Sequence, residues 1–335
     1  MLEHGGRLNQ VARQYNIPIE HWLDLSTGIN SEGWPVPEVP ASCWNRLPED
    51  DDGLLSAAQA YYATDQLLPV AGSQAAIQAL PRLRAPCVVG VFAPAYAEHA
   101  HAWSQAGHTL ITLDAERPDI AACDVVVVIN PNNPTAHLWP VSVLQQWQAE
   151  LAGRGGWLLV DEAFLDAADP SGERSMLEHT GEPGLIVLRS LGKFFGLAGL
   201  RVGFVAAWPD LLQPLQTLLG PWGISHPARW VAKRALQDQV WQQATRAKLQ
   251  QRSERLQILL TEYGLSPRGG TALFQWVVDE KAESWQQALA AEAIWVRRFS
   301  HPASLRFGLP VDEAQWQHLA SALNKIQQQS SIHVA

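Results

Sequence analysis

The chain has 335 residues and a formal net charge of −9, with 24 Lys and Arg against 33 Asp and Glu. A chain of this length can bury a large core and is more consistent with two domains than with one. Its acidity and dispersed arginines argue against nucleic-acid binding, although a few convergent arginines could still bind a small anion. No apolar run reaches the ~20 residues of a membrane span, so we expect no membrane association.

The N-terminus and the cysteines indicate a cellular compartment. Residues 1–6 lack a basic stretch followed by an apolar one, so we expect no secretory signal. The three cysteines, Cys43, Cys87 and Cys123, are scattered and form neither a CxxC pair nor a disulfide framework. These features predict a cytoplasmic protein with reduced thiols, and no metal site is expected.

A Pro-rich segment over residues 34–40 favours extended structure and separates the N-terminal residues from the rest of the chain. The composition pattern changes again after about residue 215, where long helical stretches replace short apolar runs. We therefore predict an N-terminal arm over residues 1–40, a large α/β domain over residues 41–215 and a smaller α+β domain over residues 216–335.

Short apolar runs alternate with helical stretches through the predicted large domain, and one such helix is expected over residues 141–152. Near-continuous apolar runs of this kind are typical of a mostly parallel sheet buried on both faces. In such sheets ligands bind beyond the carboxyl ends of the strands. The predicted strands cover residues 87–92, 109–113, 124–129, 157–160, 185–188 and 202–206.

The C-terminal third has a different pattern. Residues 227–263 are rich in Ala, Gln, Arg and Leu, which predicts one or two long helices that end at Gly264. A last helix is expected from Asp312, which we predict to cap it. Between them the pattern indicates a strand over 272–278, a helix near 284–293, and extended segments over 294–297 and 304–308.

Lys193 is the candidate reactive group, because it follows a predicted strand and lies among apolar and glycine residues. Such surroundings disfavour the charged amine and free it to form a Schiff base with an aldehyde. Ser190 and Arg201 could hold a phosphate beside that aldehyde, as a hydroxyl donor and a guanidinium fork. The obvious candidate for an aldehyde that carries a phosphate is pyridoxal phosphate (PLP). From these residues alone, a solvated lysine in a glycine-rich loop is the alternative.

Polar residues follow two of the other predicted strands. The cluster over residues 130–135 contains three Asn and two Pro, and it either directs Asn side chains into the strand-end crevice or forms an ordinary turn. Asp161, at the end of a buried strand, is costly unless it is paired with a proton or a cation. A protonated pyridine nitrogen is such a partner; a helix cap or a buried salt bridge are the alternatives.

Two further segments could contribute to the same site. Gly72 and Ser73 form a turn at a predicted helix N-terminus, which either binds a phosphate or caps the helix. Tyr96 follows the first predicted strand and could stack on a planar ring or belong to the core.

Taken in order, these motifs resemble those of the fold-type I PLP-dependent enzymes of the aspartate aminotransferase superfamily over nearly the whole chain. The resemblance implies a homodimer, and a mostly parallel central sheet with a smaller α+β domain. Its motifs are Gly-Ser-x-x-Ala-Ile, Pro-x-Tyr, Asn-Pro-x-Asn-Pro-Thr, Asp-Glu-Ala, and Ser-x-x-Lys with Arg eight residues later. It implies that the catalytic groups are Lys193 on the cofactor aldehyde, Asp161 on the ring nitrogen and Tyr96 stacked on the ring, with Asn133 on the ring oxygen. It assigns the cofactor phosphate to Gly72, Ser73, Gln74, Ser190 and Arg201.

A second resemblance narrows the family. The N-terminal His4-Gly5-Gly6 and the segment over residues 23–30 resemble the opening of the threonine O-3-phosphate decarboxylases, a cobalamin-pathway family close to the histidinol-phosphate aminotransferases. Phe164 agrees, because the aminotransferases have Tyr after Asp-Glu-Ala. The implied reaction converts L-threonine O-3-phosphate to (R)-1-amino-2-propanol O-2-phosphate and CO2. The implied substrate-binding residues are His4, Asn30 and Arg297 at the phosphate, Arg306 at the α-carboxylate, and Asn133.

Two other functions stay open at this stage. A histidinol-phosphate or related class I/II aminotransferase would need a keto acid as acceptor, and a regulator on the same fold would have lost the chemistry. Three positions also depart from the family pattern. Ser31 follows Asn30 where a Pro is usual. Ala136 stands where a Gly is usual, and Leu47 stands where a Tyr commonly reaches the cofactor phosphate of the neighbouring subunit.

Overall fold

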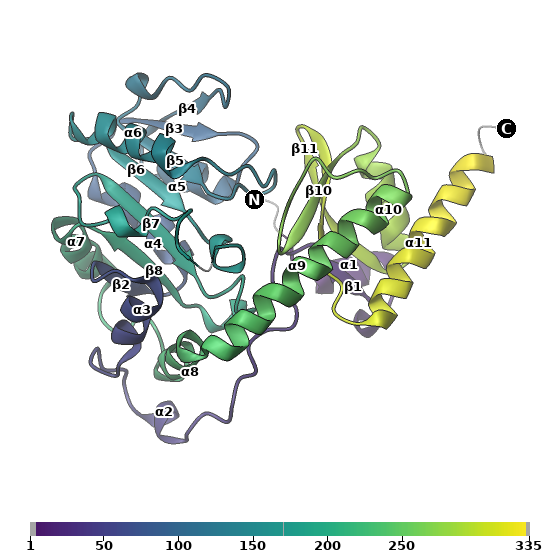
Figure 1. Ribbon diagram of the computed structural model, residues 1–335, viewed down its shortest axis with the longest axis horizontal. Coiled ribbons are helices and arrows are strands. Elements are labelled where there is room, and N and C mark those ends of the chain that lie inside the picture. Colours follow the sequence, from purple (N-terminus) through teal and green to yellow (C-terminus); the bar gives the residue numbers. More distant parts are fainter. Residues whose placement is uncertain (1–4, 170, 333–335) are drawn as a thin grey trace. The chain divides into compact units, whose positions relative to one another are not determined.

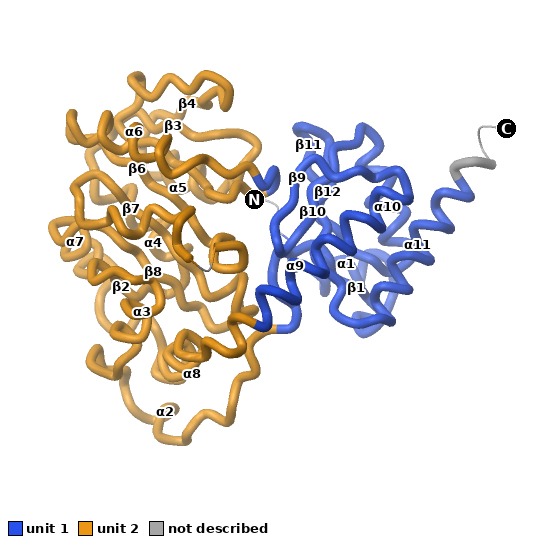
Figure 2. The backbone as a smooth tube through the Cα atoms, in the orientation of Figure 1, with its two compact units in different colours: residues 1–32, 134–136, 244–335 blue, residues 33–133, 137–243 orange. Residues whose placement is uncertain are grey.

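A computed structural model describes residues 5–169 and 171–332 of the protein (Figure 1). Its contacts form two compact units, shown in blue and orange in Figure 2. Unit 1 comprises Met1–Glu32, Pro134–Ala136 and Ala244–Ala335, and unit 2 comprises Gly33–Asn133 and His137–Gln243.

The boundaries between the two units differ from the domain boundaries predicted from the sequence at residues 40 and 215. Helix α7 (Pro209–Leu219) packs against α4 (Ser73–Ala79), and helix α8 (His226–Gln237) packs against α3 (Leu54–Tyr62). Both helices therefore belong to unit 2, whereas the boundary predicted near residue 215 divides α7 and places α8 with the C-terminal part.

Unit 2 contains a seven-stranded sheet in the order β2-β8-β7-β6-β5-β3-β4 (Figure 1). Its central strands pair in parallel, whereas β8 is antiparallel to both of its neighbours. This confirms the predicted mostly parallel sheet. The strands are β2 (Leu67–Val70), β3 (Val88–Phe92), β4 (Thr109–Leu113), β5 (Val125–Ile129), β6 (Trp157–Asp161), β7 (Leu185–Ser190) and β8 (Gly203–Ala207).

The core of unit 2 lies on both faces of this sheet. Every residue of β5 and β6 is buried, as expected for strands covered on two sides. On one face, α4, α5 (Ala97–Gln105) and α7 pack on alternate residues of the strands. Their contacts include Ile77, Trp103 and Leu215. The remaining helices of the unit are α2 (Ser42–Asn45) and α6 (Val141–Ala152).

Unit 1 contains a five-stranded sheet in the order β1-β11-β12-β10-β9, in which only the β1–β11 pair is parallel. Helix α9 starts in unit 2, directly after Asp238, and continues through unit 1. At α11, Asp312 Oδ1 accepts a hydrogen bond from Gln315 N–H at 2.9 Å, which confirms the predicted cap. The strands are β1 (Leu23–Leu25), β9 (Gly269–Thr271), β10 (Phe274–Val278), β11 (Ile294–Ser300) and β12 (Ala303–Gly308). The helices are α1 (Leu8–Tyr15), α9 (Gln239–Glu262), α10 (Ala282–Ala291) and α11 (Glu313–Ile332).

Within the described residues, no helix combines the length and the hydropathy needed to cross a bilayer.

Candidate active site

The polar residues singled out from the sequence of unit 2 gather at one edge of its sheet. Asp161 is the last residue of β6 and Ser190 the last of β7, and Ile129, which ends β5, is the register partner of Asp161. The loop with Tyr96 follows the end of β3. Because these strands are parallel, their carboxyl ends lie at the same edge, where ligands bind in sheets of this kind.

Asp161 lies at the centre of this edge and is held by two donors. It is 4% exposed, and its Oδ2 lies 2.8 Å from His99 Nε2. Its Oδ1 accepts a hydrogen bond from Ala163 N–H at 3.1 Å. A buried carboxylate is stable only when it is hydrogen-bonded or paired, and here both oxygens are hydrogen-bonded.

Tyr96 is linked to the first turn of α4. Its hydroxyl donates to Gln74 Oε1 at 3.3 Å, and Gln74 Nε2 donates to Glu98 Oε2 at 2.7 Å. Burial, with the nearby carboxylates of Glu98 and Asp161, raises the pKa of Tyr96 to about 12. The phenol therefore stays protonated at neutral pH and acts as a donor, and its ring lies edge-on to His99 at 6.2 Å between centroids.

Four residues assigned to a phosphate converge beside β8. Ser190 is the register partner of Gly203, and a Cβ at Gly203 would lie 2.6 Å from Ser73 N. A Cβ at Gly72 would lie 2.6 Å from Arg201 Nη2, and Gly72 has φ +73°. Only glycines at 72 and 203 let the 72–73 turn approach the end of β7 and the guanidinium this closely.

Lys193 lies three residues beyond the end of β7. Its Nζ is 5.2 Å from the centre of the Phe164 ring, and Phe164 follows Asp161 by three residues. Ser190 Oγ accepts a hydrogen bond from Gly192 N–H at 3.2 Å. The amine, the carboxylate and the hydroxyl assigned to the phosphate are thus carried by two neighbouring strands and the short segments that follow them.

The three Asn residues that follow β5 differ in their roles. Asn130 is fully buried and pairs with the backbone of Trp139 through both of its side-chain groups, so it shapes the turn. Asn132 Nδ2 donates to Pro94 O at 2.9 Å, which ties this loop to the one that carries Tyr96. Asn133, the residue assigned to the cofactor, is half-buried.

A buried ionic network lies beside the site residues Asp161 and Ser190, and it was not predicted from the sequence. Arg189 lies 2.8 Å from both Glu162 and Asp166, and all three side chains are at most 5% exposed. Although burial opposes its charge, these two carboxylates raise the pKa of Arg189. Burial raises the pKa of Glu162, against the opposing effect of Arg189. Glu162 directly follows Asp161, and Arg189 directly precedes Ser190. The network therefore fixes the backbone at these two site residues.

In unit 1, Arg297 and Arg306 face each other across β11 and β12. Arg306 is 6% exposed and donates to Ser26 O at 2.7 Å. Burial, and next the nearby cation of Arg297, lower the pKa of Arg306 to about 10. Two arginines at paired positions of neighbouring strands form a cationic pair suited to an anionic ligand.

The N-terminal part of unit 1 packs beside this pair. Gly6 N–H donates to Ser26 Oγ at 2.9 Å, and a Cβ at Gly5 would lie 2.5 Å from Ser26 O. Asn30 is 3% exposed, and its Oδ1 accepts a hydrogen bond from Glu32 N–H at 3.1 Å. His4, the other residue predicted to meet the substrate phosphate, lies outside the described residues.

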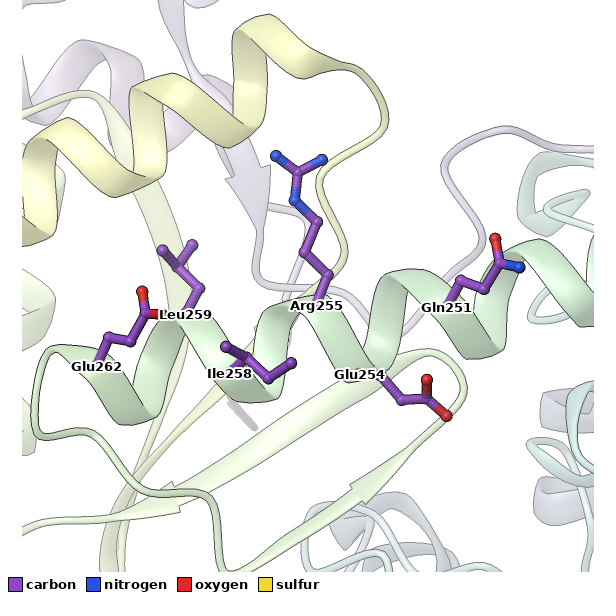
Figure 3. A pocket seen from close by; sticks show the side chains of 6 residues that line it. All are labelled: Gln251, Glu254, Arg255, Ile258, Leu259 and Glu262. Atoms are coloured by element: carbon purple, nitrogen blue, oxygen red, sulfur yellow. The ribbon is translucent and has the colours of Figure 1, made fainter.

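A surface pocket of about 420 Å³ lies along α9 in unit 1 (Figure 3). Arg255 reaches toward α11, where it forms a two-point ion pair with Glu313 at 2.8 Å. No residue that the sequence assigned to the site lines this pocket, so it is not part of the candidate active site. The lining residues are Gln251, Glu254, Arg255, Ile258, Leu259 and Glu262.

Residues 53–323 match the family model described as aminotransferase class I and II. The chain belongs to this family. A threonine-phosphate decarboxylase of Pseudomonas aeruginosa is 52% identical over 325 residues, which cover 96% of this chain and 97% of that protein. One from Sinorhizobium sp is 40% identical and covers 97% of this chain and 98% of its own length.

Solved structures of the family share the fold. A histidinol-phosphate aminotransferase from Sinorhizobium meliloti, in complex with pyridoxal-5'-phosphate, superimposes with a TM-score of 0.83 at 20% identity and covers 98% of this chain and 99% of its own. This confirms the predicted fold class.

The residues of unit 2 fit the cofactor of this family. The turn at Gly72 and Ser73, with Ser190 and Arg201 beside it, offers backbone and side-chain donors for a phosphate, and a Cβ at residue 72 would collide with the Arg201 guanidinium. Asp161 is a buried, doubly hydrogen-bonded carboxylate of the kind that pairs with a ring nitrogen.

Sequence reasoning missed His99 and Glu98, which contact the assigned residues Asp161 and Gln74. It also missed Arg189, whose ion pairs lie beside the site. His99 follows Tyr96 by three residues, as expected for side chains on one face of a helix, but that spacing alone does not identify its partner. The ionic network joins β6 to β7, so only the sheet pairing reveals it.

Proposed function

We propose that this protein is a PLP-dependent decarboxylase that converts L-threonine O-3-phosphate to (R)-1-amino-2-propanol O-2-phosphate and CO2 in cobalamin biosynthesis. The observation that carries the proposal is the 52% identity, over nearly the whole of both chains, to a relative named threonine-phosphate decarboxylase. The pair of the half-buried Arg297 and the buried Arg306 supports it, because the substrate carries both a phosphate and a carboxylate.

The residues of unit 2 would hold the cofactor. Bound PLP supplies an electron sink for the electron pair left at Cα when a bond to that carbon breaks. Lys193 Nζ would bind the aldehyde until the substrate amine displaces it, and the freed amine could then return a proton to Cα. Tyr96 would stack on the ring and Asn133 would bind the ring oxygen, while Asp161 would pair with the ring nitrogen. Gly72, Ser73, Gln74, Ser190 and Arg201 would bind the phosphate.

The residues of unit 1 would select the reaction. With PLP bound as the electron sink, the orientation in which these residues hold the substrate would decide which bond to Cα breaks, so a decarboxylase must orient the substrate for loss of its carboxylate. We infer that His4, Asn30 and Arg297 anchor the substrate phosphate and thereby favour this orientation, with Arg306 binding the carboxylate. Binding energy from a remote group would then choose which bond breaks.

The product formed from L-threonine O-3-phosphate tests this function. Purified enzyme with PLP is incubated with the substrate, with and without 2-oxoglutarate, and the products are identified by mass. We expect CO2 and aminopropanol phosphate in equal amounts without a keto acid, and no product from Lys193→Ala. Conversion that requires 2-oxoglutarate and yields glutamate would instead identify an aminotransferase and refute decarboxylation.

We further propose that the enzyme is a cytoplasmic homodimer that needs neither a nucleic-acid nor a membrane partner. Several large apolar side chains of unit 2 are exposed in the single chain, among them Trp44 at 69% and Val240 at 81%, as expected for a surface that another chain covers. Light scattering after gel filtration should give twice the chain mass of 36.9 kDa. A mass of one chain at micromolar concentration would contradict the dimer.

A further inference from the structure

Trp276 is a buried hydrogen-bond donor to which the proposed reaction assigns no part. It lies in β10 and is 9% exposed. Within the described part of the chain, its buried Nε1 has no hydrogen-bond partner. A buried indole N–H usually has an acceptor, because leaving it unpaired costs free energy. The unpaired donor therefore indicates an acceptor that a bound ligand supplies.

Trp276 lies beside the cationic pair of unit 1. In the antiparallel register Trp276 is the partner of Arg306, and Arg306 is in turn the partner of Arg297. Residues directly opposite each other project from the same face of a sheet, with their Cβ atoms about 4.5–5.5 Å apart. The three side chains thus form a row on one face of the sheet, in the order Trp276, Arg306, Arg297.

Other contacts show that the guanidinium of Arg306 extends along this face. Its Cζ is 5.2 Å from the centre of the Phe274 ring, and Phe274 lies two residues before Trp276 and so on the same face of β10. The neighbouring Gln275 points to the opposite face, where its Nε2 donates to Ser253 O of α9 at 3.1 Å. The indole of Trp276 therefore lies on the side of the sheet that carries the guanidinium groups.

The strand order indicates which anionic group Trp276 could contact. Strand β12, with Arg306, lies between β10 and β11, so Trp276 is adjacent to Arg306 and two strands away from Arg297. Neighbouring strands are about 4.8 Å apart, which separates the backbones at Trp276 and Arg297 by roughly 10 Å. An acceptor that Trp276 shares with a guanidinium is therefore the group that Arg306 binds.

We propose that the indole N–H of Trp276 donates a hydrogen bond to the substrate carboxylate at Arg306 and makes the site selective for ligands that carry this group. The proposal rests on the proposed function, which assigns the carboxylate to Arg306. Arg306 supplies the charge, and Trp276 adds a neutral donor with a fixed direction. A ligand without a carboxylate leaves the buried N–H unpaired and binds more weakly. The decarboxylated product is such a ligand, so this donor favours substrate over product.

Two ligands and two variants isolate this hydrogen bond. The compound 3-phosphooxybutyrate is the substrate without its amine, and isopropyl phosphate lacks the carboxylate as well. Trp276→Phe keeps an aromatic ring and removes the donor. Trp316→Phe is the matched control, because Trp316 is also a buried tryptophan of unit 1, at 4% exposed, but contacts Arg255, which lies 4.4 Å from its ring centre.

The first readout is the affinity of the PLP-loaded enzyme for each ligand, measured by calorimetry. We expect Trp276→Phe to bind 3-phosphooxybutyrate about tenfold more weakly and isopropyl phosphate as tightly as the unaltered enzyme does. Trp316→Phe should bind both as the unaltered enzyme does. Unchanged affinity of Trp276→Phe for 3-phosphooxybutyrate, or equal weakening for both ligands, would overturn the proposal.

A second replacement separates the donor from the shape of the side chain. At residue 276, 3-benzothienylalanine keeps the form of the indole but has sulfur in place of the N–H group. We expect it to weaken the binding of 3-phosphooxybutyrate as Trp276→Phe does. Full affinity with this residue in place would show that the N–H group does not bind the carboxylate.

The second readout does not depend on the reaction. In protein with ¹⁵N-labelled tryptophan, with and without PLP, the Trp276 indole signal is the one missing from Trp276→Phe. We expect 3-phosphooxybutyrate to move this signal downfield and isopropyl phosphate to leave it nearly unchanged; no movement with 3-phosphooxybutyrate would overturn the proposal. If the enzyme forms no aminopropanol phosphate, the proposed function fails, while this readout still decides whether Trp276 binds a carboxylate.

Discussion

Gly72 is the residue at which the geometry of the phosphate-binding turn is most tightly constrained. Its φ of +73° and ψ of 157° lie in a region that is essentially restricted to glycine, where other residues cost about 1–3 kcal/mol. A Cβ there would also lie 2.6 Å from Arg201 Nη2. We expect Gly72→Ala to lower the free energy of unfolding by about this amount and to displace the guanidinium, so that PLP binds about tenfold more weakly or worse.

Chemical denaturation and a titration with PLP measure both effects. Gly199→Ala is the control, because no atom lies within 4 Å of a Cβ at that position, two residues from Arg201. We expect that control to stay within about 0.5 kcal/mol of the unaltered protein. If Gly72→Ala binds PLP as tightly as Gly199→Ala does, the proposed phosphate site is wrong.

Ala136 adopts a left-handed conformation, with φ +61°, at the position where the related motif has Gly. This conformation costs an L-residue about 1–2 kcal/mol. We therefore expect Ala136→Gly to raise the free energy of unfolding, by about 1 kcal/mol after the larger chain entropy of glycine is subtracted. Urea denaturation measures the change.

The comparison variant for Ala136→Gly is Ala149→Gly, in the exposed interior of α6. Glycine within a helix costs about 1 kcal/mol, so this second variant should shift stability in the opposite direction. A loss of stability in both variants would show that the conformation at residue 136 is not strained.

At the scale of elements, one ion pair joins α8 to the start of α3. Arg229 Nε and Nη2 donate to Asp52 at 2.6 and 3.0 Å, and Asp52 Oδ1 also accepts from Leu54 N–H. Burial alone would raise the pKa of Asp52, but these hydrogen bonds outweigh it and hold the pKa below 3.8. Because the pKa is lower in the folded state, the stabilisation is present above pH 3.8 and is lost as the pH falls through the folded value.

We therefore expect Asp52→Asn to lower the free energy of unfolding at pH 7 by about 1.5–3 kcal/mol, the usual effect of hydrogen bonds to a charged group. The difference from the unaltered protein should shrink steadily as the pH falls below about 4. Urea denaturation between pH 7 and 3.5 follows it. A difference that is constant over this range would show that the charge of Asp52 contributes nothing to the link.

The strands and helices were largely predictable because their patterns are local. All six apolar runs between residues 87 and 207 are strands, the helix over 141–152 has the predicted bounds, and residues 227–263 form two helices that meet at Asp238. β2 was missed because Pro69 interrupts its pattern. The reversed direction of β8 was also missed, since a twelve-residue connection from β7 does not reveal it.

Only those residues of the candidate site that belong to sequence motifs could be predicted. Gly72, Ser190 and Arg201 come from three separate segments, and the structure brings them together beside Gly203. The partners that hold the site residues in place, such as His99 for Asp161, follow no sequence rule because they depend on how the fold brings the start of α5 to the end of β6. Such pairings are properties of the fold and not of any segment.

Considered as a whole molecule, the chain distributes its chemistry between two units. The groups assigned to the cofactor belong to unit 2, and the described cationic pair of Arg297 and Arg306 belongs to unit 1. Unit 1 is assembled from distant parts of the chain, because β1 pairs in parallel with β11, some 270 residues later. Its sheet therefore forms only after nearly the whole chain is available.

The central claim is that Lys193 Nζ forms a Schiff base with the aldehyde of PLP. Borohydride reduction of the PLP-loaded enzyme, followed by digestion and mass spectrometry, tests it most directly. We expect one pyridoxyl group for each chain, on the peptide that contains Lys193, and none after reduction of Lys193→Ala. A label on a different lysine, or no label in an enzyme that still acts on L-threonine O-3-phosphate, would contradict the account.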